Sequence, residues 1–322
     1  MSTSEHGYVV AVDIGGSNLR LALADMNGTI AARWLSSTTG SRNADQIINL
    51  IRRGIDHLLE ETSTPRAALR AIGAGAPGVT NVDDGIVIVT SYLLGWRDVP
   101  LRKLLQSAFQ IPAAVDNDVN LAAIGEFSSG AAKGISHFVF LAIGTGIGAG
   151  IVLNSHPFRG QGWSAGEIGY MLVPGIRDHV RTSGKPGALE SMIGGEGIKA
   201  EWQRQWSPEG TALRIDSTPT EIFDGALRGD LAARNLLGQT ARLLASAIYN
   251  VSLVLNCTLF VLGGGVGTHP ALVAGTQQVL DQWTEREPLR VVSSTLGPEA
   301  QLIGGIRMAL SAALSRSDLA FS

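Results

Sequence analysis

The run Tyr8-Val9-Val10-Ala11-Val12-Asp13-Ile14-Gly15-Gly16-Ser17-Asn18 is apolar up to a pair of glycines, and a second apolar run continues to Ala24. Two apolar, β-rich runs joined by a glycine turn predict a β-hairpin. The plan recurs: 137–143 is apolar and β-rich, Gly144-Thr145-Gly146-Ile147-Gly148 supplies a turn, and an apolar run returns over 149–153. Two such openings, each followed by mixed helices and strands, predict a duplicated α/β core.

Helical and extended patterns follow each hairpin. Apolar residues recur at helical spacing over 44–61, and further helices are expected over 116–126, 230–255 and 301–314. The helix over 230–255 becomes apolar nearly all round, as a buried helix would. Strands are expected over 71–75, 111–115 and 259–262, and the polar segment 175–187 is expected to be an exposed loop.

Composition narrows the class of protein. The 322 residues are 45% hydrophobic and 16% charged, which is enough apolar material for a sizeable core and a length typical of two domains. The net charge is −3 and there is no basic stripe, so we expect no nucleic-acid partner. Cys257 is the one cysteine, which excludes a disulfide framework and a multi-cysteine metal site.

Neither a secretion signal nor a membrane span is expected. The first eight residues are polar and mildly acidic, without the basic-then-apolar order of a signal peptide. Two long stretches lack Asp, Glu, Lys and Arg, but glycines interrupt 134–158, and asparagines and glycines interrupt 243–280. We therefore expect a cytoplasmic protein that contacts no membrane.

Three glycine turns follow apolar strands, and each could hold an anion. They are Gly15-Gly16-Ser17-Asn18, Gly144-Thr145-Gly146 and Gly263-Gly264-Gly265. Without Cβ atoms, backbone N–H groups can approach a phosphate closely. Any one turn alone is better explained by a hairpin or by close packing, but three at strand ends favour a nucleotide polyphosphate site. The sequence contains no Walker lysine motif, and the Gly144 turn lacks the helix that a Rossmann turn requires.

Asp13 directly precedes the first turn. A carboxylate in this place could hold Mg²⁺ directly or through water. The alternative is a turn-initiating aspartate that is hydrogen-bonded to its own backbone.

Six motifs together carry a family resemblance. In chain order they are Asp13-Ile14-Gly15-Gly16-Ser17-Asn18, Gly75-Ala76-Pro77-Gly78, Asp116-Asn117-Asp118-Val119-Asn120, Gly144-Thr145-Gly146-Ile147-Gly148, Gly166-Glu167-Ile168-Gly169 and Leu262-Gly263-Gly264-Gly265. This ordered set resembles the ROK family of sugar kinases and repressors, over roughly Val9 to Gly305. The resemblance implies an α/β protein with the two-domain actin/hexokinase-like (ribonuclease H-like) fold and a central cleft. The expected small domain is 1–117 plus 305–322, closed by the C-terminal helix, and the larger domain is 118–304.

The resemblance also implies a chemistry. ATP, with Mg²⁺ near Asp13, would be held by the two hairpin turns and by the third glycine cluster, and Asp118 would be the general base. The residues agree with this role, because Asp118 follows a strand at the expected start of a helix, where the helix dipole favours an ionised carboxylate. The alternative for Asp118 is a plain N-cap aspartate.

The acceptor side departs from the family pattern. By resemblance, Gly75, Asn117, Glu167 and Glu190 contact the acceptor; for Glu190, a solvent-facing glutamate at a helix start is an equal alternative. Tyr170 stands where the family has a zinc-binding, sugar-contacting histidine, and Tyr92 where it often has an asparagine. The cysteines of the family zinc site are also missing between 175 and 188, so no zinc site is expected.

These changes lead to one functional expectation with a stated alternative. We expect an ATP-dependent kinase acting on a primary hydroxyl of a hexose or hexose-like acceptor, such as glucose, an amino sugar or a cyclitol. The alternative is a sugar-sensing protein without kinase turnover. Family repressors carry a helix-turn-helix domain before the first hairpin, where this chain has about seven residues, so a repressor is not expected. A homodimer is expected only by resemblance.

Overall fold

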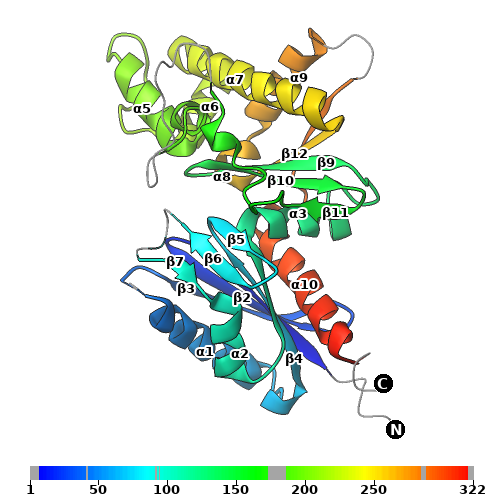
Figure 1. Cartoon of the computed structure of the whole chain (residues 1–322). Helices are drawn as coiled ribbons and strands as arrows, with labels where there is room; N and C mark the ends of the chain where they lie inside the picture. The colour runs from blue at the N-terminus through cyan, green and yellow to red at the C-terminus, as the bar shows by residue number, and fades with distance from the viewer. Residues whose placement is uncertain are drawn as a thin grey trace. The chain divides into compact units, whose positions relative to one another are not determined.

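The chain forms two compact units. The structure, a computed structural model, describes residues 7–40, 43–90, 93, 95–172, 186–283 and 288–317. Unit 1 comprises Met1–Ser129, Arg159–Ser164 and Glu299–Ser322, and unit 2 comprises Gly130–Phe158 and Ala165–Pro298 (Figure 1). Most of the loop expected over 175–187, together with Tyr92, lies outside the described residues. No described helix is long and apolar enough to cross a membrane.

Each unit is built on a five-stranded sheet with the same plan. The sheet of unit 1 has the order β3-β2-β1-β4-β8, and that of unit 2 has the order β11-β10-β9-β12-β13. In both sheets the first three strands pair antiparallel and the last two are added in parallel. The strands are β1 (Tyr8–Ile14), β2 (Asn18–Asp25), β3 (Ile30–Ser37), β4 (Leu69–Ala76), β8 (Ala113–Asn117), β9 (Phe138–Ile143), β10 (Ile147–Leu153), β11 (His156–Phe158), β12 (Leu259–Gly263) and β13 (Arg290–Ser293). This repetition confirms the predicted α/β duplication.

Helices cover both faces of the sheet in unit 1. Strand β1 alternates: Val10 and Val12 pack with α1 (Ala44–Glu61) and α2 (Leu101–Phe109), whereas Val9 and Ala11 pack with α10 (Ala300–Ser317). Helix α3 (Asp118–Ser129) runs beside α10 (Figure 1). Three short strands, β5 (Val79–Asn81), β6 (Ile86–Val89) and β7 (Arg97–Val99), form a separate sheet in this unit.

Most predicted elements are present, with shifted ends. Helix α1 has the expected bounds, because the Asn43 side chain accepts a hydrogen bond from Gln46 N–H and caps it. The helix expected from Asp116 begins at Asp118 instead. Asp116 and Asn117 are the last two residues of strand β8, which pairs with β4 up to Asn117.

The unit boundaries differ from the expected domain boundaries. Helix α3, expected in the larger domain, belongs to unit 1 because it packs against α10, where Gly125 and Gly304 allow the two backbones to approach closely. The C-terminal part of unit 1 begins at Glu299, which forms an ion pair with Arg33, and not at residue 305. Residues 159–164 also join unit 1, and an ion pair between Arg159 and Asp116 holds them there.

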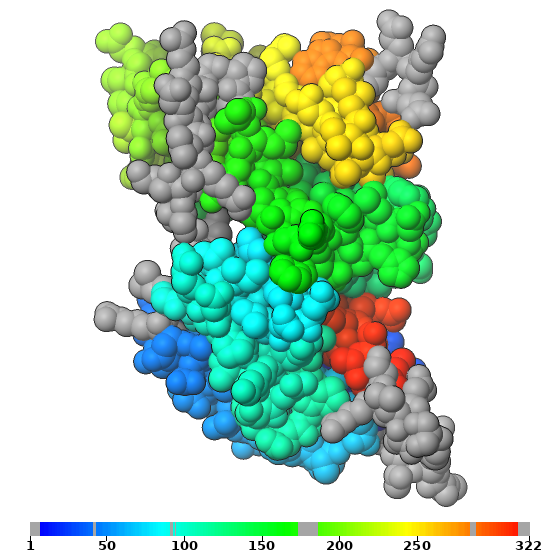
Figure 2. Space-filling model, in the orientation of Figure 1, coloured from blue at the N-terminus to red at the C-terminus, as the bar shows by residue number. Residues whose placement is uncertain are grey.

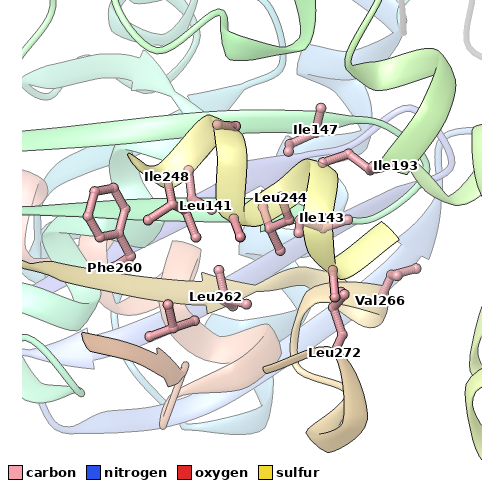
Figure 3. Packing of buried hydrophobic residues seen from close by; sticks show 14 of the residues in the cluster. Leu141, Ile143, Ile147, Ile193, Leu244, Ile248, Phe260, Leu262, Val266 and Leu272 are labelled. Carbon is pink, nitrogen blue, oxygen red and sulfur yellow. The ribbon is translucent and has the colours of Figure 1, made fainter. Parts of the chain in front are cut away.

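Unit 2 packs its helices around the second sheet. They are α4 (Glu190–Ile193), α5 (Gly195–Gln205), α6 (Pro219–Leu227), α7 (Leu231–Leu255), α8 (Gly264–Gly267) and α9 (Pro270–Asp281). The described part of the chain also contains the 3-10 turns η1 (Arg66–Ala68), η2 (Ile168–Tyr170) and η3 (Gly297–Glu299). Figure 3 shows Ile143 and Leu262 from the strands near Leu244 of α7, within one apolar cluster.

Helix α7 is not buried all round, contrary to the sequence prediction. Leu244 and Ile248 lie in the core of unit 2, but Leu253 is 67% exposed and Val254 is 82% exposed. The C-terminal half of the helix, in yellow, reaches the surface in Figure 2. Apolar composition alone could not show which side of the helix lacks a neighbour, because a buried and an exposed leucine look identical in the sequence.

The close contact between α10 and α3 gives a stability prediction. A Cβ on Gly304 would lie 1.9 Å from the carbonyl oxygen of Leu121, so Gly304→Ala must push the two helices apart. Overpacking of this kind costs about 1–3 kcal/mol. We expect a lower midpoint of urea unfolding, measured by circular dichroism.

The matched control is Gly238→Ala in α7. Gly238 is exposed and a Cβ there meets no atom within 4 Å, so alanine should stabilise the helix by about 0.5–1 kcal/mol. Equal midpoints for the two variants would contradict the proposed close packing of α10 on α3.

Candidate functional site

In the first glycine turn, the carbonyl groups of Gly15, Ser17 and Asn18 are hydrogen-bonded within the protein. Gly15 N–H donates to the Asn18 carbonyl (2.8 Å), while the Thr38 hydroxyl donates to the Gly15 carbonyl (3.1 Å) and Thr38 N–H to the Ser17 carbonyl (3.0 Å). Thr38 is buried, and its two hydrogen bonds hold the turn in place. The N–H groups of Gly16 and Ser17 have no partner within the described part of the chain, and both residues are exposed. The tip therefore offers two hydrogen-bond donors to an anion.

The second glycine turn is supported in the same way, by a helix. Gly195 and Glu196, at the start of α5, donate their N–H groups to the carbonyls of Gly144 (2.8 Å) and Thr145 (3.2 Å). Gly144 N–H donates to the Gly146 carbonyl (3.0 Å), so all three carbonyls of the turn are engaged. The N–H groups of Thr145 and Gly146 have no partner among the described residues. Each hairpin turn thus has engaged carbonyls and available N–H groups.

The third glycine cluster lies beside the second turn, because Gly263 of β12 pairs with Ala142 of β9. Gly263 and Gly264 are packing residues: a Cβ on Gly263 would lie 2.2 Å from the Phe140 ring, and one on Gly264 would lie 2.4 Å from the Ile143 carbonyl oxygen. Gly264 also has a φ of +80°. Around a Cβ on Gly265 there is open space, so Gly265 is the member of the cluster that a ligand could approach.

The sheet of unit 1 aligns three of the predicted site positions. Asp13 of β1 pairs with Gly75 of β4, and Gly75 pairs with Asp116 of β8. These strands are parallel, so their carboxyl ends lie at one edge of the sheet. With strands about 4.8 Å apart, the backbones of Asp13 and Asp116 are roughly 10 Å apart. The first glycine turn and the start of α3 therefore project from the same edge.

Asp118 is the first residue of α3, and it is partly buried. Its Oδ1 accepts the N–H of Val119 at 3.0 Å. The N-cap of the helix is provided by Asn117, whose Oδ1 accepts the N–H groups of Val119 (2.8 Å) and Asn120 (3.2 Å). The plain N-cap alternative therefore describes Asn117 better than Asp118.

Asn117 has partners for both ends of its amide inside unit 1. Besides the cap made by Oδ1, Nδ2 donates to the Gly78 carbonyl at 2.8 Å. If Asn117 contacts the acceptor as predicted, the same amide group must also keep these internal hydrogen bonds. Gly75 lies against the same helix start: a Cβ there would be 3.4 Å from Asp118 Cα and 2.7 Å from a Leu121 methyl group. Gly75 thus gives α3 room to approach β4.

Asp13 forms an ion pair with Arg20. Its carboxylate is 8% exposed and accepts hydrogen bonds from Arg20 Nε (2.8 Å) and Nη2, and Arg20 also reaches Gln301. Burial raises the pKa of Asp13 above its ordinary value of 3.8, and Arg20 acts in the opposite direction. A Mg²⁺ bound directly to Asp13 would face the guanidinium, so the residues present fit an ion held through water and do not fit direct coordination.

Three predicted acceptor residues come together in unit 2. Glu167 and Tyr170 lie at the ends of one short turn, in which Tyr170 N–H donates to the Glu167 carbonyl (3.2 Å). Glu190, at the start of α4, accepts the N–H of Ile147 on its Oε2 at 3.1 Å. Gly169 lies next to this carboxylate, since a Cβ there would be 3.4 Å from Oε2. Glu190 therefore connects the turn of Glu167 and Tyr170 to the strand that follows the second glycine turn, and it is not merely a solvent-facing glutamate.

Several supporting residues were not predicted from the sequence. Thr38 holds the first turn, Gly195 the second, Arg20 binds Asp13, and Arg159 binds Asp116. The glycine pair Gly194-Gly195, at the start of α5, was the sequence signal that could have identified the support of the second turn. Nothing in the sequence pairs Arg159 with Asp116, because they are 43 residues apart and on elements whose proximity only the fold creates.

A comparison with protein-family models matches residues 9–312 to the ROK family. The chain belongs to the ROK family. A glucokinase of Halalkalibacterium halodurans is 32% identical over 311 residues, which cover 92% of this chain and 93% of that protein. A xylose repressor of Caldicellulosiruptor bescii is 24% identical over 98% of this chain and 81% of its own length.

The solved structures bear out the ROK fold. The structure of a ROK glucokinase from Streptomyces griseus in complex with glucose and AMPPNP matches with a TM-score of 0.80 at 24% identity, over 95% of this chain and 100% of that one. This confirms the predicted two-domain, actin/hexokinase-like fold class. The glucokinase relatives support a ROK sugar kinase, without identifying its acceptor.

The expected absence of the ROK zinc site concerns a segment that is mostly undescribed. Among the described residues, no three His, Cys, Asp or Glu side chains are grouped as a metal site. His179 and most of the segment that would carry the zinc ligands lie outside those residues, so the absence of zinc stays a prediction from the sequence.

The Asp13–Arg20 pair gives a pH-dependent prediction. In Arg20→Met the buried Asp13 carboxylate loses its counter-charge, which should destabilise the fold by on the order of 3 kcal/mol at neutral pH. The pKa of Asp13 in the folded state is raised by burial above 3.8 and should rise further without Arg20. Folding then favours the protonated form, so stability is lost as the pH rises through the folded-state pKa.

Thermal unfolding of Arg20→Met between pH 4.5 and 8 tests this. The deficit in melting temperature relative to wild type should grow as the pH rises, and Asp13→Asn/Arg20→Met should remove most of that pH dependence. A deficit that is constant with pH would contradict the assignment of the buried charge to Asp13.

Proposed function

We propose that this ROK protein is an ATP-dependent kinase that phosphorylates a primary hydroxyl of a hexose or hexose-like acceptor. The observation that carries the proposal is the shared sheet edge in unit 1, from which both the first turn, with its available N–H groups, and the carboxylate of Asp118 extend. The second turn has the same arrangement in unit 2. The similarity to a glucokinase supports the same activity.

Asp118 is proposed as the general base. It would accept the proton of the acceptor hydroxyl as the hydroxyl oxygen attacks the γ-phosphorus of ATP in line. The bond from the γ-phosphorus to the bridging oxygen breaks, ADP leaves, and the proton remains on Asp118. The position of Asp118 in the first turn of α3 supports this role, because the dipole of the helix favours its ionised form.

The two hairpin turns are proposed to hold the phosphates of ATP. The N–H groups of Gly16, Ser17, Thr145 and Gly146 supply hydrogen bonds to phosphate oxygens where a Walker lysine acts in other kinases. Asn18, Gly15 and Gly144 shape these turns, and Gly263, Gly264 and Gly265 would lie toward the adenosine. Mg²⁺ carried with ATP would offset phosphate charge, and Asp13 would reach it through water.

Glu167, Glu190 and Tyr170 are proposed to contact the acceptor, together with Asn117 and Asp118. Ionised carboxylates accept hydrogen bonds from hydroxyl groups strongly. Tyr170 offers one hydroxyl in place of the family's imidazole, which supports an acceptor other than plain glucose, such as an amino sugar or a cyclitol. The glucokinase relative supports glucose. A cytoplasmic location and a homodimer are kept as expectations by resemblance.

The second candidate is a sugar-sensing protein without turnover. The similarity to a xylose repressor over most of the chain favours it. Asp118 and the available N–H groups of both hairpin turns favour the kinase, because a sensor that only binds sugar needs neither.

Asp118→Asn tests the kinase directly. Asparagine keeps the hydrogen-bond acceptor at the helix start but cannot take a proton, so kcat should fall about 10²–10⁴-fold while both KM values stay within a few-fold. The measurement is ADP release with each acceptor. Asp45→Asn, an exposed carboxylate in the first turn of α1, is the matched control and should leave kcat unchanged. Near-normal turnover of Asp118→Asn would show that Asp118 is not the base. A wild-type protein that releases no ADP with any of the acceptors would favour the sensor.

Tyr170→His tests the acceptor side. Restoring the imidazole should raise kcat/KM for glucose about tenfold relative to amino sugars and cyclitols, because the family contact is regained. The measurement is a panel of these acceptors with Mg-ATP, using Tyr170→Phe to separate loss of the hydroxyl from gain of the imidazole. A wild-type enzyme that already prefers glucose clearly would eliminate the hypothesis of an unusual acceptor.

A further inference from the structure

Asp116 is a buried carboxylate that accepts four hydrogen bonds. Its Oδ2 accepts from Arg159 Nε (3.0 Å) and Nη2, and its Oδ1 accepts from Asn117 N–H (2.7 Å) and Asn120 Nδ2 (2.9 Å). The side chain of Asp116 is 1% exposed and that of Arg159 is 25% exposed. The donors thus come from the end of β8, from the first turn of α3 and from the segment 159–164.

These bonds constrain the residues on both sides of Asp118. Asp116 fixes the peptide N–H of Asn117 and the side chain of Asn120, while Asn117 in turn caps the helix. Asp118 lies between the two asparagines, so its backbone cannot turn without breaking this network. Asp116 thereby helps to fix the backbone position from which the Asp118 side chain extends.

The charge of Asp116 requires a partner. A buried ion pair is a poor source of stability, since an apolar pair of similar volume often does as well. A lone anion two residues before Asp118 would disfavour ionisation of the second carboxylate. Arg159 cancels that anion through two hydrogen bonds to one oxygen.

We propose that Arg159 is a positioning residue for the base: bound to Asp116, it fixes the start of α3 and keeps Asp118 ionised. This inference rests on the proposed function of Asp118. The pair also holds residues 159–164 on unit 1, although the chain on both sides of this segment belongs to unit 2.

Other charged groups on the elements packed around Asp118 are further along those elements. On α3 itself the next one is Glu126, eight residues on, which corresponds to about 12 Å of helix. Strand β4 carries Arg70 near its opposite end from Gly75, α10 carries Arg307, and α2 carries Arg102 and Lys103. Asp116 is hydrogen-bonded to Asn117, the residue before Asp118, and Arg159 is hydrogen-bonded to Asp116.

The test titrates Asp118 in the full-length protein. Carboxyl ¹³C NMR of aspartate-labelled protein follows its ionisation, and Asp118→Asn identifies the signal. Arg159→Gln leaves the charge of Asp116 uncompensated, so the midpoint should rise by about half a pH unit or more, whereas Asp116→Asn leaves Arg159 uncompensated and should lower it. Asp116→Asn/Arg159→Gln, which restores a neutral pair of donor and acceptor, and Arg159→Lys, which keeps the charge, should return the midpoint close to that of wild type.

The acid limb of kcat/KM against pH should shift in the same directions, with KM values changing less than kcat. A merely structural pair would reduce stability or activity in both single variants without moving the midpoint in opposite directions, and that result would overturn the proposal. If the NMR midpoints move as expected but the wild type phosphorylates no acceptor, the proposed function fails while the control of Asp118 ionisation by this pair stands.

Discussion

The parallel pairing of β4 with β1 on one side and with β8 on the other positions the proposed site residues of unit 1. Parallel strands end together, so Asp13, Gly75 and Asp116 form one row across the sheet. The first glycine turn leaves this edge at one end of the row, and the helix of Asp118 leaves it at the other. A slip of one residue in β4 or β8 would turn these side chains to the other face.

In both hairpin turns backbone carbonyl groups are hydrogen-bonded within the protein, but the donors differ between the two turns. In unit 1 a buried threonine and the end of β3 engage the carbonyls, and in unit 2 the first N–H groups of α5 do so. Either way the N–H groups at the tip have no partner among the residues that the structure describes. Anion recognition of this kind depends on the placement of carbonyl partners, so it does not require any particular side chain at the tip.

Charges near the proposed site are arranged in pairs within unit 1. Arg20 binds Asp13 and Arg159 binds Asp116, each with the carboxylate more buried than the guanidinium. Asp118, proposed as the general base, is the first residue of α3, two residues after Asp116. In the proposed mechanism the two arginine-paired carboxylates stay charged and support the site, and Asp118 accepts the proton.

The duplicated α/β plan, both hairpins, the bounds of α1 and the strand before Asp118 follow from the sequence alone, because apolar periodicity, glycine turns and caps act over a few residues. The tertiary structure decided what those local signals cannot contain. It assigned α3 to unit 1, gave the capping role to Asn117, exposed one side of α7, and paired Asp13 and Asp116 with arginines. Each of these depends on residues brought together from distant parts of the chain, and the physical reason is that burial and charge neutralisation are properties of neighbours in space and not of neighbours in sequence.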